Sequence, residues 1–101
     1  HPKISFIVCD LSFISITKGL EKIIATKKKD MSILALIKPQ FELSKDMIGK
    51  KGVVTNSAYR KTAISKVSDW FEKNGWIKKS LVESPITGVA GNREYFIYCV
   101  K

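Results

Sequence analysis

Three charged residues stand beside apolar runs of strand length, and their types could carry out proton chemistry. Asp10 follows the first run, Lys38 follows the second, and Glu94 precedes the last run of the chain. In an open α/β sheet, chemistry takes place at strand ends. A lysine whose pKa is lowered by burial or by a neighbouring cation can accept a proton, and carboxylates can orient it. Asp10, Lys38 and Glu94 are therefore candidate catalytic residues.

Each of the three residues also has an ordinary structural explanation. A lysine after a strand is commonly part of the solvated surface, so Lys38 needs no function. Asp10 could cap the turn that follows it. Glu94 could pair with a lysine on a neighbouring strand. The residue types alone leave these alternatives open.

The elements that must position these residues follow from the hydrophobic pattern. Apolar runs at 5–9 and 31–37 are typical of strands buried on both faces, and the apolar residues of 16–26 recur at helical spacing. A strand, a helix and a strand in this order predict a parallel pair. Pro39 cannot continue a central ladder, so the second strand should end at about Lys38.

The second half of the chain begins with a long polar connection at residues 40–56, a length that indicates a functional or mobile loop. An amphipathic helix is predicted over 57–74. Ser57 is its expected N-cap and Gly75 the residue just beyond its end.

Two further strands are predicted at 76–83 and 93–100, joined without a helix by a loop that contains Pro85 and two glycines. Strands joined in this way form an antiparallel hairpin, here at one edge of the sheet. The order β-α-β-α-β-β predicts an α/β fold that amounts to about half of a doubly wound sheet.

Length, net charge and cysteine content limit the classes of function that this chain could have. The 101 residues suit one small domain, and 18 basic against 9 acidic residues give a net charge of +9, which favours phosphate backbones or anionic membranes as partners. A lysine-rich solvated surface explains the charge equally well. No apolar run approaches the ~20 residues that span a bilayer. Cys9 and Cys99 lie in apolar runs, as buried reduced thiols do, and this favours a cytoplasmic protein.

Four segments in order carry a resemblance to a known family. They are CDLSFIS at 9–15, ALIKPQFE at 35–42, GKKGVV at 49–54 and SPITGVAGNREYF at 84–96. Together they resemble the C-terminal half of the TlyA proteins, in the FtsJ-like group of S-adenosylmethionine-dependent methyltransferases that modify ribose 2′-hydroxyls of ribosomal RNA and have also been called haemolysins. The resemblance implies that residues 1–101 are a partial Rossmann-like methyltransferase domain, strands four to seven of the family's seven. The family's N-terminal RNA-binding domain and its cofactor-binding glycine loop have no counterpart in this sequence.

The resemblance also implies roles for individual residues. The family uses a Lys-Asp-Lys-Glu set, in which Asp10 matches the aspartate, Lys38 the second lysine and Glu94 the glutamate, while the first lysine would lie upstream of residue 1. Lys38 is then the expected proton acceptor, with Asp10 and Glu94 as orienting groups. The expected cofactor is S-adenosylmethionine, which Asp10, Ser12 and Phe13 would contact, although Ser12 and Phe13 suit core packing equally well. No metal ion is expected.

The expected partner is ribosomal RNA or a ribosomal subunit, and no membrane. Five basic residues are candidate RNA contacts, with solvated surface as the equal alternative: Lys45, Lys50, Lys51, Arg60 and Lys61. The family commonly has glycine where this chain has Lys51. In half a domain, the strand at 5–9 would become an apolar edge, which predicts self-association or pairing with an N-terminal portion. The fragment alone should bind the cofactor weakly or not at all and be inactive.

Two other function classes compete with an RNA methyltransferase. A non-catalytic RNA-binding module would explain the charge, but phosphate binding alone does not require two acids beside a lysine. A membrane-active haemolysin would need a membrane-inserting element, and the predicted helices have ordinary core-facing stripes.

Overall fold

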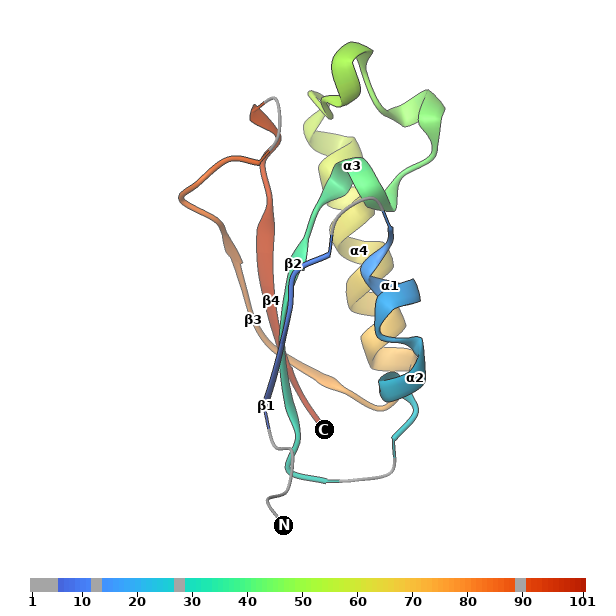
Figure 1. Cartoon of the computed structure of the whole chain (residues 1–101), viewed down its shortest axis with the longest axis vertical. Coiled ribbons are helices and arrows are strands. Elements are labelled where there is room, and N and C mark those ends of the chain that lie inside the picture. The colour runs from blue at the N-terminus through green and yellow to red at the C-terminus, as the bar shows by residue number, and fades with distance from the viewer. Residues whose placement is uncertain (1–5, 12–13, 27–28, 89–90) are drawn as a thin grey trace.

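The protein folds as a four-stranded sheet with all its described helices on one face (Figure 1). The computed structural model describes residues 6–11, 14–26, 29–88 and 91–101. The strand order is β1-β2-β4-β3, with bounds β1 Phe6–Cys9, β2 Ser32–Ile37, β3 Ile77–Glu83 and β4 Tyr95–Val100. β1 and β2 are parallel, and β4 is antiparallel to both β2 and β3. The predicted α/β class, parallel pair and edge hairpin are confirmed.

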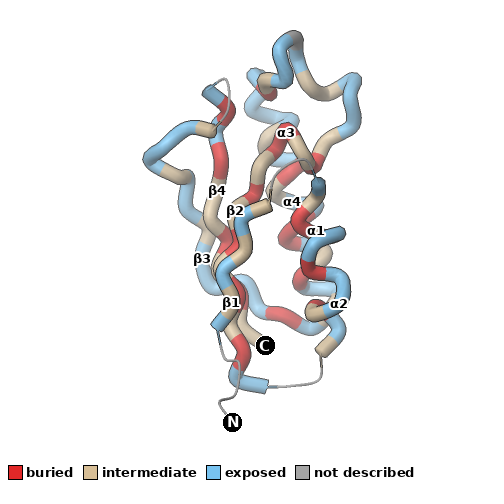
Figure 2. The backbone as a smooth tube through the Cα atoms, viewed as in Figure 1, coloured by how far each residue is buried: buried red, intermediate tan, exposed pale blue. Residues whose placement is uncertain are grey.

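Side-chain alternation gives the sheet two unlike faces. Ile33, Ala35 and Ile37 of β2 are fully buried and pack in one cluster with residues of the helices. The residues between them point to the opposite face. Along that face the register aligns Val8 with Leu34 and Leu34 with Tyr98. No helix among the described residues covers it, and we call it the open face (Figure 2).

β1 departs from the burial that its sequence indicates. Both-sided burial was the expectation for the run at 5–9, whereas Phe6 is 53% and Val8 65% exposed. Both project on the open face, and β1 pairs with β2 alone within the part of the chain that the structure describes. The apolar composition of β1 suits a sheet with a further strand and a second helical layer, and neither is present among these residues.

The prediction of one continuous helix at 16–26 is wrong. Two single-turn helices replace it, α1 at Ile16–Gly19 and α2 at Glu21–Ile24, separated by Leu20 in a non-helical conformation. The side chain of Leu11 packs where a Cβ of Gly19 would lie. A glycine within a helix also weakens it. The packing of Leu11 therefore accompanies a break in the helix that the apolar spacing does not reveal.

The long helix α4, Ser57–Lys73, confirms the prediction closely. Its N-cap is Asn56 rather than Ser57, because the Asn56 side chain accepts a hydrogen bond from the Ala58 amide at 2.8 Å. Gly75 has a φ of +85° and follows the end of the helix as predicted. The Gly75 amide donates to the Glu72 carbonyl, and the Trp76 amide donates to the Phe71 carbonyl. This pattern satisfies the last carbonyl groups of the helix.

The connection at 40–56 is shorter and more structured than a single loop. Pro39 begins the one-turn helix α3, Pro39–Glu42, at a position where its missing N–H costs nothing. Two 3₁₀ turns follow at Lys45–Met47 and Lys50–Gly52. Lys51 has a φ of +65°, in the left-handed region that favours glycine. A glycine would adopt this conformation without the steric cost that a Cβ brings.

A single core joins the sheet to the helices. Val67 and Phe71 of α4 pack with Ile97 and Cys99 of β4, and all four side chains are fully buried. Trp76 closes the lower end, where its Nε1–H donates to the Ile24 carbonyl at 2.8 Å. This bond fixes the end of α2 against the start of β3.

Glu42 fixes where α1 begins. Its side chain is only 2% exposed, and its Oε2 accepts the Ile16 amide at 2.8 Å. Its Oε1 accepts the Ser15 hydroxyl at 2.6 Å and pairs with Lys66 at 3.0 Å. A carboxylate suits a helix start because amides there lack partners within the helix. The last residue of α3 thus holds the segment that follows β1.

The two thiols should differ in reactivity. Burial raises the pKa of Cys99 to about 11, and burial and the Asp10 charge raise the pKa of the half-buried Cys9. Because the thiolate is the reactive form, alkylation of Cys99 should stay slow at pH 8 and increase only as the pH approaches the raised pKa. Mass spectrometry after iodoacetamide treatment of native protein should find Cys9 modified before Cys99. Equal rates in the native protein, as expected after denaturation, would contradict this burial.

Removal of the Glu42 carboxylate should destabilise the protein. Glu42→Ala leaves the buried Ile16 amide without its acceptor and Lys66 without its ion-pair partner, and we expect a loss of about 2–3 kcal/mol in the free energy of unfolding. Urea unfolding measures the loss. Glu72→Ala, an exposed acid on α4, is the matched control and should change stability by less than about 0.5 kcal/mol. Similar losses in both variants would refute the anchoring role.

Candidate active site

The three charged candidates meet at one end of the sheet. Asp10 directly follows β1, Lys38 directly follows β2, and Glu94 directly precedes β4. Because β1 and β2 run parallel and β4 runs against them, these positions share one edge. The β2–β4 register pairs Ile37 with Tyr95, so its continuation by one residue sets Lys38 opposite Glu94. The sequence prediction that the three lie together is thus matched by the geometry.

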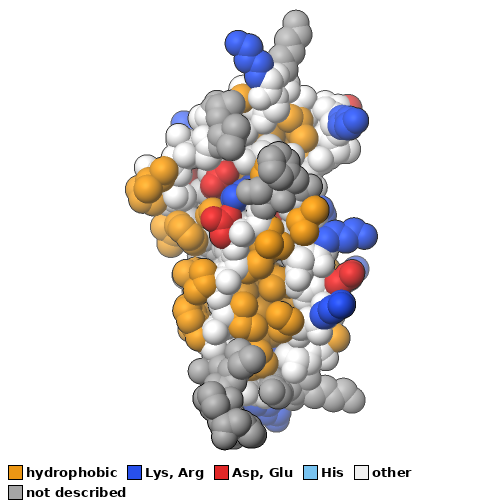
Figure 3. All heavy atoms as spheres, viewed as in Figure 1, with side chains coloured by type: hydrophobic (Ala, Val, Ile, Leu, Met, Phe, Trp, Pro, Cys, Tyr) orange, Lys and Arg blue, Asp and Glu red, His pale blue; other side chains and the backbone are white. Residues whose placement is uncertain are grey.

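Strand alternation also assigns them a common face. Ile37 points into the core, so Lys38 projects from the open face, and Asp10 follows Val8 on the same face of β1. Figure 3 shows acidic and basic side chains gathered near the upper ends of the strands, above an apolar surface over β1. The charged site therefore borders an uncovered apolar surface.

Asp10 and Lys38 form a short ion pair. The Lys38 Nζ lies 2.6 Å from the Asp10 Oδ1, with the lysine side chain 12% and the aspartate side chain 60% exposed. The lysine stem is thus buried while the acid is open to solvent. The exposure of Asp10 screens the attraction, so the pair should contribute only modestly to stability. Its consequence is geometric, since Asp10 orients the Lys38 ammonium and remains accessible to a ligand.

Glu94, unlike Asp10, is buried, and a hydrogen bond holds its carboxylate. The residue is 7% exposed, and its Oε2 accepts a hydrogen bond from the Gln40 Nε2 at 3.0 Å. The carboxylate also packs against the α-carbon of Gly88, where a Cβ would overlap it. The amide of Gln40, in α3, is thus one partner of the Glu94 carboxylate. Gln40 is a site residue that sequence reasoning missed, although it lies in the quoted segment at 35–42.

Asn92 braces the loop that carries Glu94. It is buried, and its side-chain oxygen accepts the Val54 amide at 2.8 Å while its Nδ2 donates to the Gly52 carbonyl at 2.8 Å. Arg60 of α4 donates to the Val54 carbonyl at 3.1 Å. The glycine- and lysine-containing segment near residue 52 is therefore tied to the loop before β4. Asn92 was also missed, and its signal was its place beside Glu94 in the segment at 84–96.

The remaining predicted site residues have varied settings. Ser12 and Phe13, predicted to contact the cofactor, lie outside the described residues. Lys45, Lys51 and Lys61 are exposed, as an RNA contact or a solvated lysine would be. Lys50 falls in a 3₁₀ turn, and its side chain is outside the described part. Arg60 is half-buried and has the structural contact given above, so its guanidinium also stabilises the loop.

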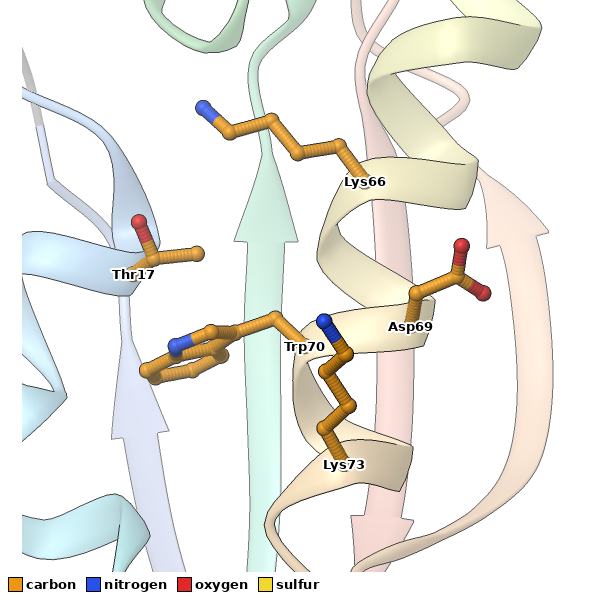
Figure 4. A pocket seen from close by; sticks show the side chains of 5 residues that line it. All are labelled: Thr17, Lys66, Asp69, Trp70 and Lys73. Atoms are coloured by element: carbon orange, nitrogen blue, oxygen red, sulfur yellow. The ribbon is translucent and has the colours of Figure 1, made fainter.

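A hollow on the helical side of the molecule lies away from this site. It has a volume of about 240 Å³ and is lined by Thr17 of α1 and by Lys66, Asp69, Trp70 and Lys73 of α4. In Figure 4 the Trp70 ring extends toward α1, whereas Asp69 points away from it. Lys66 stretches from the rim and pairs with Glu42. Because it opens between helices and not on the open face, the hollow is separate from the charged strand ends.

Within residues 6–11, 14–26, 29–88 and 91–101, no group of three or more His, Cys, Asp or Glu side chains is placed to hold a metal ion. Among the same residues, no helix has the length and apolar character to cross a membrane.

Comparisons with known proteins agree with this architecture. The model of the FtsJ-like methyltransferase family matches residues 1–101. The chain is 34% identical over 96 residues to the 16S/23S rRNA (cytidine-2′-O)-methyltransferase TlyA of Mycobacterium tuberculosis (strain CDC 1551 / Oshkosh), covering 95% of this chain and 36% of the relative. It is 40% identical over 104 residues to the 23S rRNA (cytidine-2′-O)-methyltransferase TlyA of Campylobacter jejuni (serotype O:23/36, strain 81-176), covering 98% and 39%.

A solved structure extends the likeness to the fold. A Streptococcus thermophilus protein whose name carries the word hemolysin superposes with a TM-score of 0.88 at 33% identity. The match covers 96% of this chain and 35% of that protein. The chain thus spans little more than a third of the length of these relatives. Because the family match covers the whole sequence and the solved structure superposes over 96% of it, the chain belongs to the FtsJ-like methyltransferase family.

Proposed function

We propose that the protein to which this chain belongs transfers a methyl group from S-adenosylmethionine to a ribose 2′-hydroxyl of ribosomal RNA, and that this segment supplies catalytic side chains. The observation that carries the proposal is the Lys38–Asp10 pair of 2.6 Å at the strand ends, with Glu94 opposite Lys38. The names of two relatives describe cytidine-2′-O methylation of rRNA. A ribosomal RNA substrate would also place the protein in the cytoplasm.

The residues present fit part of a cofactor site. The Asp10 carboxylate is accessible at the carboxyl end of β1, the usual place for a ligand in an open α/β sheet. A negative, exposed group there suits a cationic ligand. When bound, S-adenosylmethionine supplies a methyl group on a positively charged sulfur. The rest of the cofactor contacts would come from residues beyond this segment, so the chain by itself should bind cofactor weakly and be inactive.

Lys38 is the proposed proton acceptor. The ribose 2′-hydroxyl is a weak nucleophile until its proton begins to leave. S-adenosylmethionine would supply the methyl group to this oxygen and leave without it, and the Lys38 Nζ would take up the hydroxyl proton. Lys38 must be neutral to accept it, and the family's first lysine is the cation that would favour this form. Asp10 and Glu94 hold the Nζ in position.

Basic residues beyond the strand ends are proposed to position the RNA. Lys45, Lys51 and Lys61 are exposed on the connection and the first turns of α4, and Lys50 and Arg60 belong to the same region. The net charge of +9 supplies the matching field for a phosphate backbone. Contacts of this type hold RNA in register without reading its sequence.

Loss of Lys38 should abolish methyl transfer. In the full-length protein, we expect Lys38→Ala to reduce transfer of labelled methyl groups to ribosomal RNA by at least about a hundredfold, the usual contribution of a general base. Lys22→Ala, an exposed lysine on α2 and outside the proposed RNA-contact set, is the control and should retain most activity. Equal labelling by wild type and Lys38→Ala would remove Lys38 from the mechanism. If wild type labels neither naked RNA nor ribosomal subunits but still binds RNA, the non-catalytic RNA-binding alternative is favoured.

The isolated chain should self-associate through β1. Within the described residues the outer edge of β1 is unpaired, and Phe6 and Val8 are 53% and 65% exposed. An exposed apolar edge of this kind pairs with another chain. Analytical ultracentrifugation of the 101-residue chain should detect dimers or larger species, and Val8→Lys should return monomers. Ile86→Lys, in a loop and 76% exposed, should leave the association unchanged. A wild-type chain that stays monomeric would contradict the proposal.

A further inference from the structure

The one-turn helix α3 connects the parts of the candidate site. Lys38 is its N-cap residue, so the helix starts where β2 ends. Gln40 reaches from it to Glu94, and Glu42 reaches from it to the segment that follows Asp10. Of these contacts, the one between Gln40 and Glu94 joins the helix directly to a proposed catalytic group.

The orientation of the Gln40 side-chain amide satisfies its nitrogen and leaves its oxygen without a hydrogen-bond partner among the described residues. Gln40 is only 9% exposed, and its Nε2 donates to the Glu94 Oε2 at 3.0 Å. Its Oε1 is fully buried and has no hydrogen-bond partner among the described residues. A buried acceptor without a partner is unfavourable. Turning the amide around would be worse, because its oxygen would then face the Glu94 carboxylate, which is another acceptor.

Packing and backbone hydrogen bonds also restrict the position of Glu94. The α-carbon of Gly88 packs against it, and the Gly88 amide donates to the Asn92 carbonyl at 2.7 Å, which fixes that loop. The Glu94 carbonyl accepts the Ser84 amide at 2.8 Å, which fixes the backbone on the other side. Gln40 is thus a side-chain donor to a buried carboxylate whose backbone is held on both sides.

We propose that Gln40 is a positioning residue of this site, whose amide holds the Glu94 carboxylate toward its place opposite Lys38. The inference rests on the methyl-transfer function proposed above and adds a residue to it. Without the amide donor, the carboxylate turns to another partner, and the arrangement of Lys38 with Asp10 changes with it. Gln40 contacts neither reacting atom and acts through Glu94, so its loss slows the chemical step and leaves substrate binding intact.

The test uses the full-length protein and separates kcat from KM. Gln40→Met keeps the length of the side chain and removes the donor. We expect kcat to fall by at least about tenfold, with KM for S-adenosylmethionine and for RNA within about twofold of wild type, the signature of an interaction that matters in the transition state. Ser68→Ala is the matched control, because the buried Ser68 hydroxyl is the other side-chain oxygen without a partner among the described residues. It should leave kcat unchanged.

A double-mutant cycle identifies the route of the effect. If Gln40 acts through Glu94, Gln40→Met should cause little further loss in a Glu94→Gln background, whereas independent effects would multiply. Thermal unfolding of each variant checks that the fold is retained. A Gln40→Met protein with wild-type kcat, or a full penalty in the Glu94→Gln background, overturns the inference. A wild type that transfers no methyl group overturns the proposed function and this inference together, whereas an active wild type with a fully active Gln40→Met variant overturns the inference alone.

Discussion

Hydrogen bonding of β2 on both sides is the constraint on which the site depends. β2 runs parallel to β1 and antiparallel to β4, and three of its side chains are completely buried against the helices. The mixed pairing places the ends of β1 and β2 and the start of β4 at one edge of the sheet. Residues 10, 38 and 94, far apart in sequence, therefore become neighbours. A shift of one residue in the β2–β4 register would turn Lys38 and Glu94 to different faces.

The connection after β2 converts this shared edge into a defined arrangement. Pro39 ends the strand and starts α3, whose single turn projects Gln40 toward Glu94 and Glu42 toward the start of α1. A short helix with two buried polar side chains therefore joins the segment before β4 to the start of α1. The candidate site is held by polar contacts at its rim, whereas the sheet beneath it is held by apolar packing.

The open face explains why so basic a chain carries so much exposed apolar surface. Phe6, Val8 and Val82 are each more than half exposed, and by register they project away from the helices. In a doubly wound sheet both faces carry helices. The chain covers little more than a third of its relatives' length, so those proteins are more than twice as long as this chain.

The sequence by itself determined the class of the fold and most of its elements. Alternating or continuous apolar runs specified the strands, and the apolar stripe with Gly75 after it specified α4, because both depend on local periodicity and backbone conformation. The resemblance also singled out Asp10, Lys38 and Glu94. Local pattern could not reveal that Leu11 would pack against Gly19 and accompany a break in the predicted helix, or that Asn56 would cap α4 in place of Ser57.

Only the tertiary structure decided how the charged residues are held. The burial of Glu94, its bond to Gln40 and the anchoring of α1 by Glu42 join residues that are 54 and 26 positions apart. Such contacts depend on strand register and on which side chains lose access to water, and neither is encoded in residue spacing. The sequence names the groups that could do chemistry, and the sheet edge with α3 sets their positions, because hydrogen bonds between distant segments form only once the chain has packed.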